Sequence, residues 1–233
     1  MNPSAIILAA GANTRLKGIV PSFRKPLLLM NGRPLIQHAL QFAYAQCVTR
    51  IVIVASPHNV ADLVSVTPVA PHIRWVIQPE PTSVIDAIEL AMPLCTGAYT
   101  FVLCADNTFD GDFILPNGCD SGFASRHVPW PQSQRFTRYS LGSHGVNLRL
   151  IPAESDEQGD GCWIGPLLLH TNSLATTLQA HRLGSHPIKT MAELIALSTG
   201  PDHRLAPVPM QCSDMGIPEE WEDRRAGERR TNE

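Results

Sequence analysis

Apolar residues in the first part of the chain fall into short runs separated by an amphipathic stretch. The runs SAIILA (Ser4 to Ala9) and RIVIVA (Arg50 to Ala55) are apolar almost throughout, which is typical of strands buried on both faces of a parallel sheet. Between them, residues 34–46 carry apolar side chains at helical spacing, and Pro34 stands where a first-turn proline is favoured. The pattern predicts a strand, a helix and a second strand.

The same order then repeats along the chain. The pattern predicts a weak helix at Ala61–Val66, a strand at Ile73–Ile77, a helix at Ser83–Met92 and a strand at Tyr99–Cys104. This alternation predicts an α/β fold, a Rossmann-like and mostly parallel sheet with helices on both faces. Such sheets bind ligands beyond the carboxyl ends of their strands, so the loops after Ala9, Ile77 and Cys104 are candidate sites.

The second half of the chain is less regular. Residues 116–161 shift towards Gly, Ser, Pro and polar side chains, and we expect a small inserted lobe there. Further elements are predicted as strands at 122–125, 146–151 and Cys162–His170 and as helices at Ser173–His181 and Thr190–Ser198. Residues 222–233 are nearly all charged or polar and predict a tail. We therefore expect one domain over residues 1–233, with the lobe at 116–161 on its acceptor side.

Composition narrows the possible functions. The 233 residues are 44% hydrophobic, enough for a sizeable core, and the net charge of -3 offers no basic surface for nucleic acid or an anionic membrane. The first residues lack a positive n-region, and their apolar run is too short for a signal or a membrane span, which predicts a cytoplasmic protein. The six cysteines form no CxxC pair, and Cys95 and Cys104, which lie in apolar runs, are expected to be reduced core residues.

The sequence GANTR follows the first predicted strand directly. Gly11 allows a sharp turn that brings the backbone N–H groups of residues 10–13 towards an anion, and Asn13 tolerates a left-handed conformation. Arg15 adds a cation, although the stretch is neither a Walker loop nor GxGxxG. Lys25 supplies a second cation ten residues later. On spacing alone, a structural turn and a snorkelling lysine remain alternatives to a phosphate-binding loop.

The run LAAGANTRLKGIVPSFRKPLLLMNGRPLIQHAL resembles the signature of the sugar nucleotidylyltransferases, which read LAAGxGTRL, ten residues from Arg to Lys, Pro-Leu-Leu and a GxPxI helix start. Three later segments keep the family order. QPEPTSVIDA is similar to the base-recognition loop, VLCADNTF to a strand end that presents a metal-binding aspartate, and SDMGIPEEW to a late DxGTPE motif. The resemblance implies the nucleotide-diphospho-sugar transferase type of fold, with transfer of a nucleoside monophosphate to a sugar 1-phosphate and release of pyrophosphate.

The resemblance also implies roles for individual residues. Asp106 and Asp214 would hold Mg²⁺, a metal that takes few protein carboxylates and shares phosphate oxygens. Arg15 would neutralise the leaving pyrophosphate, Lys25 would lie nearer the α-phosphate, and Gln78 would read the base. Taken singly, the two aspartates also fit a turn and a helix cap, and Gln78 fits a satisfied loop. The nucleotide would contact Leu8, Ala9, Ala10, Gly11, Ala12, Asn13, Thr14, Gln78, Pro79, Ser83 and Ala105.

The chain departs from the family pattern at several positions. Asn13, Ser83 and Ala105 stand where the family has glycines, which implies a divergent nucleotide site. The family's Glu-Lys-Pro, which contacts the acceptor phosphate, has no counterpart, because no lysine lies between Lys25 and Lys189. The expected acceptor-side residues are Arg135, Arg149 and Gly165, with Arg138 as a further candidate for the missing cation.

Three functions therefore compete. The leading one is a Mg²⁺-dependent nucleotidylyltransferase of NDP-sugar biosynthesis, with a nucleoside triphosphate and a sugar 1-phosphate as its partners and with homo-oligomers expected from the family. The second keeps the nucleotide chemistry but uses another phosphorylated alcohol, such as a phosphocholine-like or polyol phosphate, because Glu-Lys-Pro is missing. The third is a catalytically silent regulatory homologue that only binds nucleotide. Neither nucleic acid nor a membrane is expected as a partner.

Overall fold

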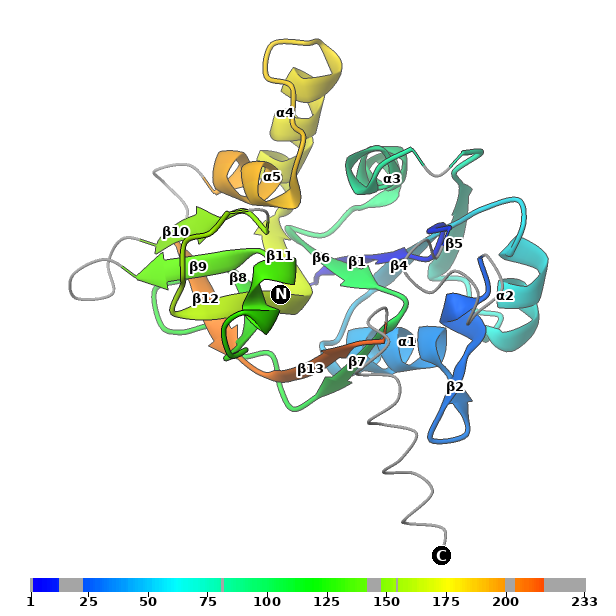
Figure 1. The fold of residues 1–233 in the computed structure, drawn as a ribbon. Coiled ribbons are helices and arrows are strands. Elements are labelled where there is room, and N and C mark those ends of the chain that lie inside the picture. The colour runs from blue at the N-terminus through cyan, green and yellow to red at the C-terminus, as the bar shows by residue number, and fades with distance from the viewer. Residues whose placement is uncertain are drawn as a thin grey trace, which may run out of the picture.

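A computed structural model describes residues 2–12, 23–80, 82–141, 148–153, 155–199 and 204–215 of the chain. Its centre is a mixed sheet with helices on both faces (Figure 1). The strands of that sheet are β1 (Ser4–Leu8), β4 (Arg50–Ala55), β5 (Ile73–Ile77), β6 (Tyr99–Cys104), β8 (Ser121–Arg126), β9 (Arg138–Leu141), β10 (Leu148–Ile151), β11 (Gly161–His170) and β12 (Leu205–Pro209). Among the described residues the main strand order is β10-β9-β11-β6-β1-β4-β5, and β8 links β11 to β12. The α/β architecture predicted from the sequence is confirmed.

The remaining elements cover or flank this sheet. Two short ladders pair β2 (Leu29–Met30) with β3 (Arg33–Pro34) and β7 (Asn107–Asp110) with β13 (Gln211–Asp214). The α-helices are α1 (Leu35–Ala45), α2 (Val60–Val66), α3 (Val84–Ala91), α4 (Thr171–Arg182) and α5 (Met191–Ser198). Short 3-10 helices are η2 (Lys25–Leu27), η3 (Met92–Leu94) and η4 (Gln132–Arg135). No helix in these described ranges is long and apolar enough to cross a membrane.

Strand β1 is the centre of the parallel half. It pairs with β4 on one side and β6 on the other, and β5 follows β4. Leu8 lies opposite both Val54 and Cys104, so the loops that follow these three strands leave the sheet at one edge. Because the chain moves from β1 first to one side and later to the other, this edge is a topological switch point, where α/β sheets bind ligands.

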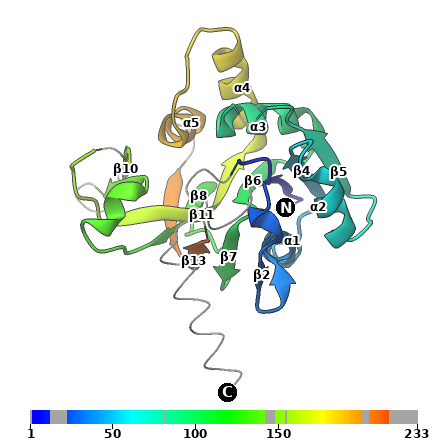
Figure 2. The ribbon, with the colours of Figure 1, turned by 45° about the vertical axis from the view of Figure 1, so that its right-hand side comes forward.

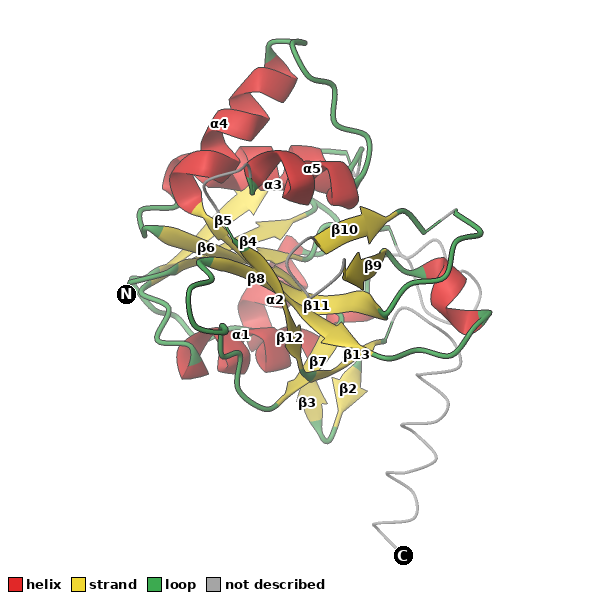
Figure 3. Ribbon diagram, turned by 90° about the vertical axis from the view of Figure 1, so that its left-hand side faces the viewer, coloured by secondary structure: helices red, strands yellow, loops and turns green. Residues whose placement is uncertain are grey.

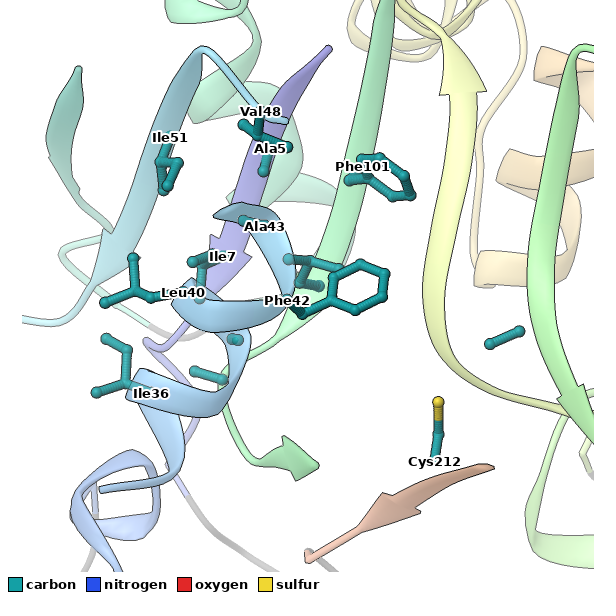
Figure 4. Packing of buried hydrophobic residues seen from close by; sticks show 14 of the residues in the cluster. Ala5, Ile7, Ile36, Leu40, Phe42, Ala43, Val48, Ile51, Phe101 and Cys212 are labelled. Carbon is teal, nitrogen blue, oxygen red and sulfur yellow. The ribbon is translucent and has the colours of Figure 1, made fainter. Parts of the chain in front are cut away.

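The helices lie in two layers, one on each face. Figures 1 and 2 show α1 and α2 on one side of the sheet and α3, α4 and α5 on the other. In Figure 4, Ile36, Leu40 and Phe42 of α1 face the β1, β4 and β6 strands. Ala39 and Ala43 complete the buried stripe of this helix with Ile36 and Leu40 at positions i, i+3, i+4 and i+7, as the sequence pattern predicts, and the larger side chains of Leu35 and Phe42 are buried beside it. Truncating one of these side chains to Ala would cost roughly 2–5 kcal/mol.

The second half of the sheet is antiparallel. β11 runs antiparallel to β6 and to both β8 and β9, which, with β10, occupy the segment predicted as a lobe (Figure 3). Pattern analysis missed β7, β9, β12 and β13. Two of these read NTFD and QCSD, polar stretches without alternation, and β12 contains two prolines, which are rare inside central strands. The predicted tail at 222–233 lies outside the described residues.

Candidate active site

Three charged side chains meet at the carboxyl edge of the parallel strands. The ammonium of Lys25 forms an ion pair with Asp106, and its Nζ lies 3.7 Å from Oδ1 of Asp214. These side chains are only 12%, 24% and 19% exposed. Charges sheltered from water interact more strongly than surface pairs. The structure therefore brings together one cation and two carboxylates from three distant parts of the chain.

The two aspartates are placed by a pair of short strands. Asp106 follows β6, and the next residue begins β7, which pairs antiparallel with β13 so that Asp214 lies opposite Asn107. The Met215 amide also donates to the Asp106 carbonyl at 3.1 Å. Figure 2 shows β7 and β13 side by side beneath the main sheet. This ladder, which the sequence pattern did not indicate, explains how the late aspartate returns to the end of β6.

The two carboxylates fit a divalent cation such as Mg²⁺. They offer oxygen donors, and both already lie close to one positive group, the Lys25 ammonium. No cluster of three His, Cys, Asp or Glu side chains occurs in the part of the chain that the structure describes. Two carboxylates are enough for a metal that takes its other ligands from water and phosphate. The donor set thus fits a metal that arrives with a phosphorylated ligand.

The start of the predicted phosphate loop lies beside this cluster. The Ala105 amide, next to Asp106, donates to the Leu8 carbonyl at 3.0 Å, and Ala9 and Ala10 are buried. Gly11 is exposed, and a Cβ placed on it would meet no atom of the described residues within 4 Å. Its backbone is therefore open to a ligand. Ala12 is half-buried, whereas Asn13, Thr14 and Arg15 lie outside the described residues.

Lys25 begins η2, with Pro26 in the first turn of that helix. The preceding Phe23 is held by the loop after β4, because its carbonyl accepts a 3.1 Å hydrogen bond from Nδ2 of Asn59. The same nitrogen donates to the Ala9 carbonyl at 2.8 Å. Asn59 is not among the residues predicted from the sequence, because the candidate loops were those after Ala9, Ile77 and Cys104. An Asn three residues beyond a Ser, directly after a buried strand, is the signal that could have found it.

The predicted base-recognition loop, between β5 and α3, is held by hydrogen bonds among its own residues. Gln78 is buried, and its Nε2 donates to the Ser83 carbonyl at 3.1 Å. Ser83 caps α3, since its Oγ accepts from the Asp86 amide at 3.0 Å. Hydrogen bonds with the Thr82 and Ser83 side chains lower the pKa of Asp86. Pro79 is exposed beside Gln78. The serine that replaces the family's glycine therefore has a structural task of its own.

The arginines predicted to bind the acceptor have different environments. Arg149 is exposed and forms an ion pair with Glu157, which raises the arginine pKa and lowers that of the glutamate through their hydrogen bond. Arg138 is 1% exposed and donates to the carbonyls of Ser133, Pro152 and Ser155. Arg138 therefore connects separate segments of the lobe, and its guanidinium donates to backbone carbonyls rather than facing a ligand. Arg135 ends η4 in the same lobe.

Gly165 lies in a register irregularity of β11, with φ at +103°. A Cβ there would lie 2.8 Å from Sγ of Cys212, so glycine is required by the close approach of β13. Arg126, which sequence reasoning also missed, donates to the Cys212 carbonyl at 3.1 Å. These two contacts fix β13, and with it the aspartate two residues further on, against the lobe.

Comparison with known proteins agrees with this geometry. Residues 5–116 match the family described as the MobA-like NTP transferase domain. The predicted resemblance to the sugar nucleotidylyltransferases is confirmed. A curated relative, bifunctional protein GlmU of Alkaliphilus oremlandii, is 32% identical over 106 residues, 46% of this chain and 22% of that protein. The chain therefore matches less than a quarter of that relative's length. The matched region contains the predicted phosphate loop, Lys25, Gln78 and Asp106.

Solved structures extend the likeness in fold to nearly the whole chain. A putative glucose-1-phosphate thymidylyltransferase from Bacillus anthracis, in complex with a sucrose, superimposes with a TM-score of 0.81 at 16% identity, covering 96% of this chain and 94% of that chain. A UDP-glucose pyrophosphorylase complexed with UDP-glucose gives 0.80 at 15% identity, covering 99% and 100%. The likeness in fold thus extends beyond residues 5–116 to the second half of the chain.

Proposed function

We propose that this protein is a metal-dependent nucleotidylyltransferase that transfers a nucleoside monophosphate from a nucleoside triphosphate to a sugar 1-phosphate. The observation that carries the proposal is the meeting of Lys25 with Asp106 and Asp214 at the switch point of the sheet. The products are an NDP-sugar and pyrophosphate. The names of the matched proteins, which include a glucose-1-phosphate thymidylyltransferase and a UDP-glucose pyrophosphorylase, support a sugar phosphate as the acceptor.

In the proposed reaction, a phosphate oxygen of the sugar 1-phosphate attacks the α-phosphorus of the triphosphate. One P–O bond forms, the bond from the α-phosphorus to the bridging oxygen breaks, and the electron pair leaves on pyrophosphate. The attacking oxygen is already ionised, so the protein need not supply a general base. Its contribution is alignment and neutralisation of charge, as in other phosphoryl transfers.

Each residue of the charged cluster has a place in this scheme. Asp106 and Asp214 would hold a divalent metal, proposed as Mg²⁺, which supplies positive charge to the phosphates. Lys25, as a compact point charge, would neutralise charge near the α-phosphate. The backbone from Ala10 onward would approach the β- and γ-phosphates at Gly11, and Arg15 would meet the leaving pyrophosphate.

The alternatives are less well supported. A silent regulatory homologue has no need for two carboxylates around one lysine, yet the chain keeps all three groups. The polyol-phosphate and phosphocholine-like acceptors rest on the missing Glu-Lys-Pro, whereas the two solved structures named above, which have the higher TM-scores, are named for sugar substrates. The acceptor phosphate would still need a cation from this chain, and Arg135 and Arg149 remain the proposed candidates.

One assay tests the proposal. The protein is incubated with each nucleoside triphosphate, Mg²⁺ and a panel of sugar 1-phosphates and alcohol phosphates, and pyrophosphate release is followed. We expect release only with a sugar 1-phosphate. Pyrophosphate release with an alcohol phosphate but with no sugar 1-phosphate would support the second function, transfer to another phosphorylated alcohol. Nucleotide binding without pyrophosphate release from any pair would support the third function, a silent regulatory homologue.

A further inference from the structure

One side chain joins both ends of the predicted phosphate loop. Asn59 is 2% exposed, and its Nδ2 donates to the carbonyl of Ala9 at 2.8 Å and to that of Phe23 at 3.1 Å. In sequence, residues 10–22 connect these two carbonyls. Both ends of the connection therefore lie within hydrogen-bond distance of a single nitrogen, which closes the base of the loop.

The oxygen of the same carboxamide is equally occupied. Oδ1 of Asn59 accepts from the amide of Ser56 at 3.0 Å and from its hydroxyl at 3.2 Å. The two donors and two acceptor positions of the carboxamide are thus all used. If the carboxamide were rotated by 180°, its NH2 group would face the amide and hydroxyl of Ser56, and its oxygen would face the carbonyls of Ala9 and Phe23, so these hydrogen bonds would be lost. Ser56, directly after β4, therefore fixes the orientation in which the nitrogen faces the loop.

The position of Asn59 in its helix supports the same conclusion. It is the N-cap residue of α2, where an Asn side chain ordinarily accepts from an amide one turn into the helix, worth about 1 kcal/mol. Its side chain makes no such bond here. Instead, all of the described side-chain hydrogen bonds of Asn59 serve Ser56 and the two loop ends. The asparagine is therefore positioned for the loop rather than for the helix.

Two more contacts connect the loop after β4 to the segment that leads to Lys25. The Phe23 ring lies against His58 with centroids 4.7 Å apart, and Arg24 pairs with Asp62 at 3.1 Å. Phe23 has φ at +63°, an unusual value for a bulky side chain, so its neighbours must hold it. Lys25 follows two residues later. The loop after β4 thereby sets the direction in which the chain reaches the charged cluster.

We propose that Asn59 is a positioning residue for the triphosphate side of the reaction. By holding Ala9 and Phe23 to one nitrogen, it fixes the separation between the backbone at Gly11 and the ammonium of Lys25. Both groups would act on one triphosphate, so an error in their spacing weakens binding and alignment together. The inference rests on the proposed function, because it assigns Asn59 to the same site.

The test compares Asn59→Leu, which keeps the branching of the side chain but removes its hydrogen bonds, with Thr100→Val. The control breaks a buried 2.8 Å hydroxyl pair between Thr100 and Thr171, at the amino end of the sheet. We expect kcat/KM for the triphosphate to fall 10- to 100-fold in Asn59→Leu, with KM for the sugar 1-phosphate within twofold of wild type. Inorganic tripolyphosphate should also inhibit this variant more weakly. Thr100→Val should change none of these values more than twofold.

Hydrogen exchange provides a readout that does not depend on turnover. The Leu27 and Leu28 amides donate to Arg24 and Lys25 carbonyls, and their exchange should be faster in Asn59→Leu but not in Thr100→Val. If Asn59→Leu does not fold, His58→Ala, an exposed position, should raise KM for the triphosphate in the same direction. Equal exchange and equal triphosphate kinetics in the Asn59 and Thr100 variants would overturn the proposal. Faster exchange in a protein whose wild type shows no turnover would overturn only the proposed function.

Discussion

The ammonium of Lys25 lies 3.7 Å from Oδ1 of Asp214, although the two residues stand near opposite ends of the chain. Asp106, at the end of β6, pairs with the same ammonium. Two carboxylates so close to each other repel, and the lysine offsets that repulsion. A divalent metal would add positive charge at the same place, so lysine and metal would act on one set of carboxylates.

This arrangement predicts a specific effect of Lys25→Met. Without the ammonium the two carboxylates are unbalanced, so the metal-free protein should be less stable, and added Mg²⁺ should raise its melting temperature more than that of wild type. Lys189→Met, at an exposed lysine, is the matched control and should respond to Mg²⁺ as wild type does. Equal Mg²⁺ responses in all three proteins would contradict a shared site for lysine and metal.

The same substitution should slow the reaction. Removing a fixed charge that stabilises a transition state costs roughly 3 kcal/mol, about 100-fold or more in kcat. Lys25→Arg should recover only part of this loss, because the guanidinium fork approaches a phosphate differently from an ammonium. Pyrophosphate release under single-turnover conditions measures the effect. An unchanged rate in Lys25→Met would remove the lysine from the chemistry.

The aspartates are tested by the metal concentration that the reaction needs. Asp106→Asn and Asp214→Asn keep the shape of the side chain but weaken its attraction for Mg²⁺, so the concentration for half-maximal rate should rise at least tenfold. Asp112→Asn, at an exposed carboxylate, serves as the control. If only one of the two variants shifted, the metal would depend on that carboxylate alone.

The sequence predicted the parallel half of the fold well, for a physical reason. Strands β4 and β6 begin and end at the predicted residues, because strands buried on both faces must be apolar throughout, and the partly exposed edge strand β5 also keeps its predicted bounds. The ladder of β7 and β13 has no such signature, since its strands are short and polar. Asp106 and Asp214 were named through the family motif, whereas their meeting with Lys25 depends on that ladder.

The role of Asn59 could not be predicted from the sequence pattern. Its carboxamide acts on the backbone carbonyls of Ala9 and Phe23, and any residue type can supply a carbonyl. No side-chain pattern therefore marks the partners of Asn59 along the chain. Arg138 is a second example. From the sequence alone, an arginine whose guanidinium binds backbone carbonyls cannot be distinguished from one that binds a ligand, and only its burial reveals the difference.

Two glycines distinguish binding from folding. Gly11→Ala adds a methyl group into open space, so the melting temperature should stay within about a degree, while affinity for the triphosphate falls because the backbone is covered.

Gly165→Ala should destabilise the protein by about 2–3 kcal/mol, since φ is +103° and the new Cβ meets Cys212 at 2.8 Å. Thermal unfolding and triphosphate titration measure both. Unchanged affinity in Gly11→Ala would argue against a phosphate at this backbone.

Cys212 gives a prediction about pH. Burial raises the pKa of its thiol to about 12 from an ordinary value of 9.0. The native state therefore holds this proton more tightly than the unfolded chain does, so the stabilisation is complete below pH 9 and is lost as the pH rises from 9 towards 12. Over that window the thiol lowers the free energy of unfolding by up to about 1.4 kcal/mol per pH unit. Cys212→Ala should flatten the alkaline part of the stability curve, measured by urea unfolding at each pH. Cys47→Ala, at an exposed thiol, should leave the curve unchanged, and an equally steep curve in both variants would assign the alkaline loss to other groups.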